Sequence, residues 1–337
     1  MHDRGSRKAL LKCMARAAFG GLAAALCLAQ AAHAFDLQGH RGARGLAPEN
    51  TLAAFRTALA IGVDTLELDL HVTRDGVVVI THDPRLNPAF TRDAQGRWID
   101  EPGPAVLQLS LAELQSHDVG RPKPGSRYAQ QWQQQRSADG ERVPTLAALF
   151  EEVKRRGAGG VRFNIETKLV PKATPDAPDL TPPPEAFAKA VVDVVRQHGM
   201  AARVTIQSFD WRTLVAVRRL APEIPTVALS ARQQFLDNIA DGRWTAGQTL
   251  AEHGGSVPRM VKAIGAAVWS PFHGDLTEPL LAEARSLGLK VIPWTVNDPA
   301  IMERLLGWGV DGLITDYPDR ARAAMKGRGM PLPAPVN

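Results

Sequence analysis

Two carboxylates and a histidine alternate along one short apolar segment of this chain. Glu67, Asp69 and His71 are each separated by a single leucine. In a β-strand, alternate side chains share a face, so this pattern predicts both carboxylates on one face. Two neighbouring carboxylates repel each other and need a cation, a proton or an arginine between them. A solvated strand edge would show the same pattern, and that alternative stays open at this point.

A predicted hairpin brings a second histidine towards this pair. Asp75-Gly76 lies between two apolar alternating segments and is a strong signal for a two-residue turn. A turn at this dipeptide pairs Asp69 with His82 across the two strands. Directly opposed residues have Cβ atoms roughly 4.5–5.5 Å apart, so the register predicts His82 beside the carboxylates. A bulge would shift the register by one residue.

Further polar residues follow other predicted strands. His40 and Arg41 come after the first apolar segment, and Glu166 and Lys168 end a later one. Three carboxylates suit a hard cation such as Ca²⁺ or Mg²⁺, and the arginine and lysine suit an anion. Two histidines suit proton transfer near neutral pH. Together they indicate metal-assisted cleavage of a phosphate ester. Neither a Gly-rich P-loop nor a G-x-S-x-G elbow is present, which disfavours nucleotide phosphoryl transfer and serine hydrolysis.

Short apolar strands alternate with amphipathic helices along the chain. We expect strands at 35–39, 64–72, 77–81, 161–167, 203–208, 226–229, 266–269, 290–295 and 312–315. We expect helices at 50–61, 146–156, 185–198, 211–220, 279–287 and 299–308. Nearly eight strand–helix units predict an α/β fold, a (β/α)8 TIM barrel over residues 35–325, whose strand ends carry the site. A doubly wound sheet is the alternative, but no Gly-rich dinucleotide loop follows the first strand.

Three segments interrupt the alternation. Residues 90–140 are weakly periodic and are interpreted as an insertion, and 171–184 hold six prolines, as expected of a stiff loop. Either segment borders the substrate cleft or decorates the surface. Residues 326–337 are predicted to form a flexible tail.

The N-terminus resembles a secretory leader. Residues 1–34 carry five basic residues and one acid, an apolar stretch from Ala17 to Ala29, and a small-x-small end at Ala32-His33-Ala34. We therefore predict a signal peptide cleaved after Ala34 and a periplasmic or secreted protein, with a membrane anchor as the alternative. The rest of the chain has 35 basic and 34 acidic residues, no cysteine and no apolar segment long enough for a membrane span. This near-neutral balance argues against a nucleic-acid partner and leaves a small-molecule substrate.

Eight short motifs in order resemble the glycerophosphodiester phosphodiesterase family. They are His40-Arg41-Gly42, Pro48-Glu49-Asn50-Thr51, Glu67-Leu68-Asp69, His82-Asp83, Asn164-Ile165-Glu166-Thr167-Lys168, Gln207-Ser208-Phe209, Trp294-Thr295-Val296-Asn297 and Asp311-Gly312-Leu313-Ile314-Thr315-Asp316-Tyr317-Pro318. The resemblance implies a barrel enzyme that hydrolyses glycerophosphodiesters to sn-glycerol 3-phosphate and an alcohol.

The resemblance also implies roles for individual residues. His40 and His82 match the general acid and base, Glu67, Asp69 and Glu166 match the ligands of one divalent cation, and Arg41 and Lys168 match phosphate-binding residues. Trp294 lies where the family often lines the glycerol side of the site. The stretch after His82-Asp83 departs from the family's threonine-rich sequence, which leaves the accepted alcohol open.

Several residues keep two interpretations. Phe209 and Trp294 stack on the substrate or close the barrel top, and Glu49 orients Arg41 or caps a helix. His71 and His273 border the cleft or are structural, and Asp316 is interpreted as a turn and helix-start residue. The alternative function is a lysophospholipase D-like or phospholipase-like barrel acting on lipid phosphodiesters, with its cleft widened by the insertion.

Overall fold

A computed structural model describes residues 35–169 and 179–337. The predicted leader and part of the proline-rich loop lie outside the described residues. Within them, no helix has both the length and the apolar character needed to cross a bilayer.

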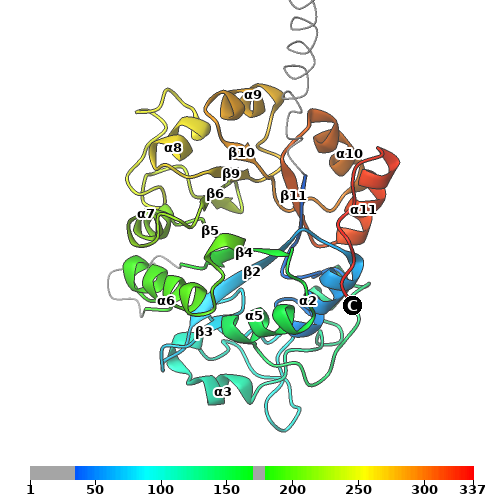
Figure 1. The fold of residues 1–337 in the computed structure, drawn as a ribbon. Coiled ribbons are helices and arrows are strands. Elements are labelled where there is room, and N and C mark those ends of the chain that lie inside the picture. Colours follow the sequence, from blue (N-terminus) through cyan, green and yellow to red (C-terminus); the bar gives the residue numbers. More distant parts are fainter. Residues whose placement is uncertain (1–34, 170–178) are drawn as a thin grey trace, which may run out of the picture. The chain divides into compact units, whose positions relative to one another are not determined.

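Eight parallel strands form the inner layer of the described residues (Figure 1). In hydrogen-bonded order they are β10 (Lys290–Val291), β9 (Val268–Pro271), β6 (Thr226–Ser230), β5 (Val204–Ser208), β4 (Arg162–Thr167), β2 (Thr65–Val72), β1 (Asp36–Gly39) and β11 (Gly312–Thr315). The two end strands meet, because Asp311 N donates to Val291 O at 2.9 Å and Ile314 N donates to Pro293 O at 3.0 Å. The sheet is therefore a nearly closed barrel, as the strand–helix alternation predicts.

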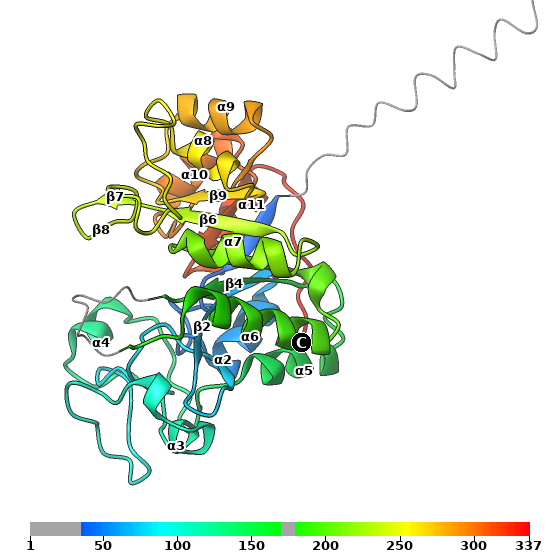
Figure 2. The same ribbon diagram turned by 90° about the vertical axis from the view of Figure 1, so that its left-hand side faces the viewer.

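Helices surround the strands, one after each barrel strand (Figures 1 and 2). They are α2 (Leu52–Ile61), α5 (Leu146–Arg155), α6 (Pro184–Gln197), α7 (Trp211–Leu220), α8 (Val257–Ala263), α9 (Glu278–Ser286), α10 (Pro299–Trp308) and α11 (Pro318–Gly327). Side-chain caps begin many of them: Thr51 accepts from Ala54 N, and Asp298 accepts from Ala300 N and Ile301 N.

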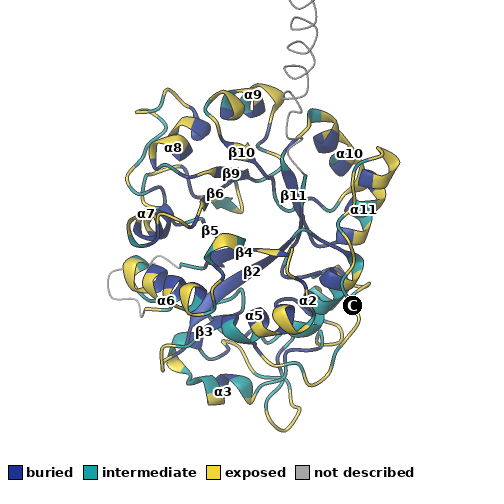
Figure 3. Cartoon of the chain, viewed as in Figure 1, coloured by how far each residue is buried: buried dark blue, intermediate teal, exposed yellow. Residues whose placement is uncertain are grey.

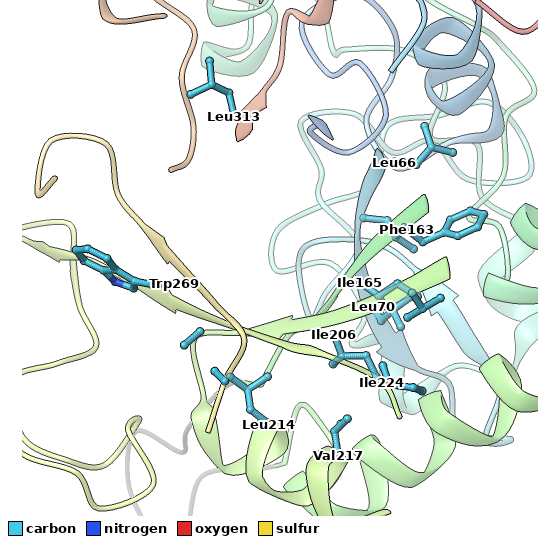
Figure 4. Close-up of a cluster of buried hydrophobic side chains, with 14 of the residues drawn as sticks. Leu66, Leu70, Phe163, Ile165, Ile206, Leu214, Val217, Ile224, Trp269 and Leu313 are labelled. Carbon is cyan, nitrogen blue, oxygen red and sulfur yellow. The ribbon is translucent and has the colours of Figure 1, made fainter. Parts of the chain in front are cut away.

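The main core lies between the strands and these helices, and exposed residues lie on the outer helix faces (Figure 3). Figure 4 shows part of it, where Phe163 and Ile206 of the strands and Leu214 and Val217 of α7 are fully buried. Each helix thus packs its apolar face on the barrel. The site residues stand at the carboxyl ends of the barrel strands.

The insertion folds into small elements that share an apolar cluster with β3 and the flanking residues. After β3 (Val78–Ile80) it contains η1 (Val106–Gln108), α3 (Leu111–Gln115) and α4 (Arg127–Gln131). The shared cluster consists of Val79, Leu86, Val106, Leu114, Val119 and Val143. A second excursion follows β6, where β7 (Arg232–Gln233) and β8 (Leu236–Asp237) form a short hairpin.

The predicted hairpin register is wrong by one residue. His71 pairs with Val79 and Leu70 with Ile80, so Asp69 lies opposite Thr81, whose N–H donates to Asp69 O at 2.9 Å. The cause is a three-residue turn: Thr73 N donates to Val77 O at 3.0 Å, and Gly76 takes the positive φ of 80° that this turn needs.

Residues 326–337, predicted to form a flexible tail, make several contacts with the barrel. Helix α11 continues to Gly327, and beyond it Val336 N donates to Leu59 O at 2.8 Å. Arg322 donates to Pro333 O at 2.6 Å and to Gly62 O at 2.9 Å. These bonds hold the end of the chain against α2. Neither α8 nor α11 was predicted from the sequence.

Candidate active site

One cavity of about 370 Å³ gathers the strand ends. Among its lining residues are most of the predicted ones: His40, Arg41, Glu67, His82, Glu166, Lys168, Phe209 and Trp294. His82 follows the antiparallel strand β3, and the others stand on or after five parallel strands far apart in sequence, whose carboxyl ends all point to one face. Asp69 lies below this lining, where its side chain is 1% exposed.

Three carboxylates meet at the base of the cavity. Glu67, Asp69 and Glu166 are buried, and one oxygen from each lies within 4.8 Å of the others. Register brings them together, since β2 and β4 pair Asp69 with Glu166 and alternation puts Glu67 on the same face. The predicted acid cluster is therefore present.

Neutral and charged donors hold the β2 carboxylates in place. Glu67 accepts from Arg41 N at 2.9 Å and from Gln207 Nε2 at 2.7 Å. Asp69 accepts from Asn50 Nδ2 at 2.8 Å and faces Arg41 Nε at 3.1 Å, but its Oδ1 is buried without a hydrogen-bond donor.

Lys168 supplies the nearest positive charge to the rest of the cluster. Its Nζ lies 2.8 Å from Glu166 Oε1 and 3.7 Å from Asp69 Oδ1. Burial alone would lower the pKa of Lys168, but Glu166 and Asp69 outweigh it and raise this pKa above its usual value. The lysine is therefore charged.

The three carboxylates titrate differently because their neighbours differ. Burial, together with Asp69 and Glu166, raises the pKa of Glu67 well above its usual range. Burial, opposed by Lys168, raises the pKa of Glu166 to about 7. Burial also acts on Asp69, but Arg41 and Lys168 outweigh it and hold its pKa well below the usual range. The cluster thus combines one carboxylate with a lowered pKa and two carboxyl groups with raised pKa values.

Both histidines are held in the same way. His40 Nδ1 lies 2.6 Å from Asp316 Oδ1, and His82 Nδ1 lies 2.7 Å from Asp83 Oδ1. Burial would raise the pKa of Asp316, but its histidine outweighs this and lowers it, so the aspartate is ionised and accepts an Nδ1–H. Each Nδ1 is thereby committed to a carboxylate. Nε2 of His40 lies 3.9 Å from Glu67 Oε2.

Each aspartate is in turn held by an asparagine. Asn297 Nδ2 donates to Asp316 Oδ2 at 2.6 Å, and Asn87 Nδ2 donates to Asp83 Oδ2 at 2.7 Å. Asp316 therefore orients a site histidine, and its interpretation as turn chemistry was wrong. The two histidine–aspartate–asparagine sets differ in exposure, since the Asp316 side chain is 3% exposed and the Asp83 side chain 36%.

The β1 loop places Arg41 through an unusual backbone. Arg41 has a φ of 50° and Gly42 a φ of 85°, and a Cβ on Gly42 would lie 2.6 Å from the Ala54 backbone. Glu49 Oε1 accepts from Arg41 Nη1 at 2.6 Å, so of its two interpretations the structure supports the one in which Glu49 orients Arg41. Thr51 is the cap.

The insertion supports this arginine from outside the cavity. Tyr128 donates to Glu49 Oε2 at 2.7 Å, and Arg44, which pairs with Glu49 at 2.8 Å, lies 4.3 Å above the Trp132 ring. No residue of 90–140 lines the described cavity. The insertion therefore acts on the site through Glu49 and Arg44.

Two histidines have structural positions. His71 Nε2 lies 3.1 Å from His82 O, and burial lowers the pKa of His71 to about 4. Neither His71 nor His273 lines the cavity. Sequence reasoning missed Asn50, Gln207 and Asp316 as site residues, although two of them stand at strand ends within the quoted motifs.

Comparison with known proteins now decides the family. The model of the glycerophosphoryl diester phosphodiesterase family matches residues 40–320. The chain belongs to this family. It is a phosphodiesterase that hydrolyses glycerophosphodiesters.

Individual relatives agree with this assignment. The glycerophosphodiester phosphodiesterase of Bacillus subtilis is 32% identical over 293 residues, which are 86% of this chain and 85% of that protein. A crystal structure from Silicibacter pomeroyi DSS-3, assigned as a glycerophosphoryl diester phosphodiesterase, is 35% identical with a TM-score of 0.78 and covers 88% of this chain and 95% of its own. An Oleispira antarctica phosphodiesterase in complex with the product sn-glycerol-3-phosphate is 25% identical with a TM-score of 0.62, over 86% and 96%.

The carboxylates of this phosphodiesterase fit a divalent cation. Their oxygens are the donor atoms that Ca²⁺ and Mg²⁺ prefer, and Asp69 Oδ1 is a buried oxygen that lacks a donor. A bound cation would also offset the repulsion from Asp69 and Glu166 that, together with burial, raises the pKa of Glu67.

Proposed function

We propose that this enzyme hydrolyses glycerophosphodiesters to sn-glycerol 3-phosphate and an alcohol, with His40 and His82 as the general acid and base. One observation carries the proposal: two histidines, each fixed through Nδ1 by an aspartate, line one cavity above three buried carboxylates. A fixed Nδ1–H leaves Nε2 of each ring for a proton of the substrate or of the nucleophile.

The charges around the cavity match a phosphodiester. Arg41 and Lys168 line it and supply positive charge for the nonbridging oxygens, while Glu49 keeps the Arg41 guanidinium in place. Phe209 and Trp294, whose rings lie 5.1 Å apart, offer faces for the carbon skeleton of the substrate.

Glu67, Asp69 and Glu166 would hold one divalent cation, Ca²⁺ or Mg²⁺. When bound, such a cation supplies Lewis-acid stabilisation of charge on phosphoryl oxygens. The chain's own residues position it: Arg41 N and Gln207 fix Glu67, and Asn50 fixes Asp69.

The test is release of sn-glycerol 3-phosphate from glycerophosphocholine by purified protein, with added Ca²⁺, with Mg²⁺ and with EDTA in parallel. We expect release that EDTA abolishes and one of the cations restores. Release that is unchanged in EDTA would reject the cation, and no release from folded protein with either cation would reject the reaction.

We also propose that the protein is exported after cleavage at Ala34. The support is the basic start, the apolar stretch and the small-x-small end of residues 1–34. Expression from its own start in a Gram-negative host should yield periplasmic protein that begins at Phe35. Cytoplasmic protein that begins at Met1 would contradict this.

A further inference from the structure

A row of aromatic rings runs outward from the base of the cavity. The Phe209 ring lies 5.7 Å from Lys168 Nζ and 5.1 Å from the ring of Trp294. Phe272 continues the row at 5.5 Å from Trp294, and Phe235 ends it at 5.3 Å from Phe272. The row therefore connects the charged site with the β7–β8 hairpin.

The cavity has two chemically different halves. The half formed after β1, β2 and β4 is polar and charged, with His40, Arg41, Arg44, Glu67, His82, Glu166 and Lys168. The half formed after β5, β6 and β10 is mostly apolar, with Phe209, Leu229, Phe235, Leu236, Trp244 and Trp294. A diester that bridges them would place one substituent in each half.

The apolar half offers no free negative charge. Among its described lining residues, the acid is Asp210, and Asp210 is bonded to Arg212 Nε at 2.9 Å and caps α7. A quaternary ammonium group would gain from the ring faces but would meet the repulsion of Lys168, and no free carboxylate in this half would offset that repulsion. A neutral apolar group does not meet this repulsion.

Phe235 is the exposed end of this half. Its side chain lies in the turn between β7 and β8 and is 65% exposed, and Figure 2 shows this hairpin projecting from the barrel. An apolar chain laid along Phe235 would bury surface that the free protein leaves in water. The hydroxyls of glycerol need polar partners, which the other half supplies.

We propose that the part of the apolar half formed by Leu229, Phe235, Leu236 and Trp244 is a subsite for a neutral, apolar alcohol group, while Trp294 faces the glycerol carbons. The enzyme would then prefer diesters of glycerol phosphate whose alcohol carries an alkyl chain. This inference rests on the proposed function and names its substrate class.

The test compares glycerophosphomethanol, glycerophosphobutanol and glycerophosphohexanol with glycerophosphocholine and glycerophosphoglycerol, by release of sn-glycerol 3-phosphate. We expect kcat/KM to rise with the alkyl chain by up to about fourfold for each fully buried methylene, and the two polar diesters to fall below the hexyl diester. Phe235→Ala and Leu236→Ala should flatten this rise. Leu332→Ala, another large apolar side chain that is 37% exposed, is the matched control and should keep the wild-type rise.

The outcomes separate this subsite from the reaction itself. Hydrolysis with no preference for the longer alkyl diesters, or an unchanged rise in Phe235→Ala and Leu236→Ala, overturns the subsite and leaves the reaction standing. If kcat/KM rises instead with an acyl chain on the glycerol, and Phe235→Ala abolishes that rise, the assignment of the subsite to the alcohol is overturned. Release from none of the diesters by folded protein overturns the proposed function and this inference together.

Discussion

Replacing Asp316 with asparagine should switch the tautomer of His40. Asn297 Nδ2 donates to Asp316 Oδ2, and Asn297 is itself fixed because its Oδ1 accepts from Asp316 N at 2.9 Å. The new side-chain oxygen would therefore stay with Asn297, and the new NH₂ group would face His40 Nδ1. That nitrogen would have to accept a hydrogen bond, which moves its proton to Nε2. His40 would then present the wrong protonation state to the substrate.

The size of the effect follows from the role of His40 and the burial of its partner. A positioned acid or base contributes roughly 10²–10⁴ in rate, and Asp316 is too buried for water to replace it. We therefore expect kcat of Asp316→Asn to fall by about 10²–10³, with a smaller change in KM. Asp83→Asn is the matched control: it removes the equivalent bond to His82, but Asp83 is 36% exposed, so water can substitute and a fall of about tenfold is expected.

The assay combines steady-state release of sn-glycerol 3-phosphate with ¹⁵N NMR of the histidine rings and a thermal unfolding curve. The NMR signature of His40 should move from the Nδ1–H to the Nε2–H form in Asp316→Asn. Activity within about threefold of wild type, or an unchanged tautomer, would refute the reasoning. A loss of folded protein alone, with the tautomer kept, would equally show that Asp316 acts on stability and not on His40.

Three further predictions concern the same site. His40→Ala and His82→Ala should each lower kcat by roughly 10²–10⁴ in folded protein, and near-full activity of either variant would reject its catalytic role. Burial, opposed by Lys168, raises the pKa of Glu166 to about 7, so cation binding below that pH must displace a proton. The affinity for Ca²⁺, measured by calorimetry at pH 6, 7 and 8, should therefore rise with pH, and a constant affinity would contradict this. The raised pKa of Glu166 also means that the native state holds a proton which the unfolded state releases, so the free energy of unfolding of cation-free protein falls as pH rises from about 4.5 to about 7. Glu166→Gln should therefore be more stable than wild type at pH 8, by at most about 3 kcal/mol, and no more stable at pH 4.5. Urea unfolding in EDTA at the two pH values measures this difference, and a variant without the gain at pH 8 would disprove it.

The sequence was sufficient to predict the barrel and most of the cavity. Helices α7 and α10 begin and end where predicted, because an aspartate cap precedes each and the apolar positions repeat with helical spacing. Parallel strands carry their carboxyl ends to one face, so polar residues at those ends had to meet. The clustering of Glu67 with Glu166 could therefore be predicted from their positions on the strands alone.

Other features depended on turn geometry and long-range contacts, which the spacing of residues in the sequence does not determine. The β2–β3 register turned on whether Asp75-Gly76 forms a two-residue or a three-residue turn, and both place glycine at a positive φ. His82 nevertheless lines the cavity, because it lies beyond the last β3 residue and its position is set by its loop. Asp316 was missed because its partner is 276 residues away and a turn explained it locally.

The barrel interior beneath the carboxylates shows how position and charge are controlled separately. A chain of amides runs across it: Asn164 Nδ2 donates to Gln38 Oε1 at 2.8 Å and to Gln207 Oε1 at 2.9 Å, and Gln207 Nε2 donates to Glu67. Because these donors are neutral, they fix Glu67 without neutralising it. Asp69, in contrast, faces the charged Arg41 and Lys168, and its pKa is the one held low. The amides therefore keep Glu67 in place without pairing it with a positive charge, so its carboxyl group stays available to a cation, which a second arginine at that position would prevent.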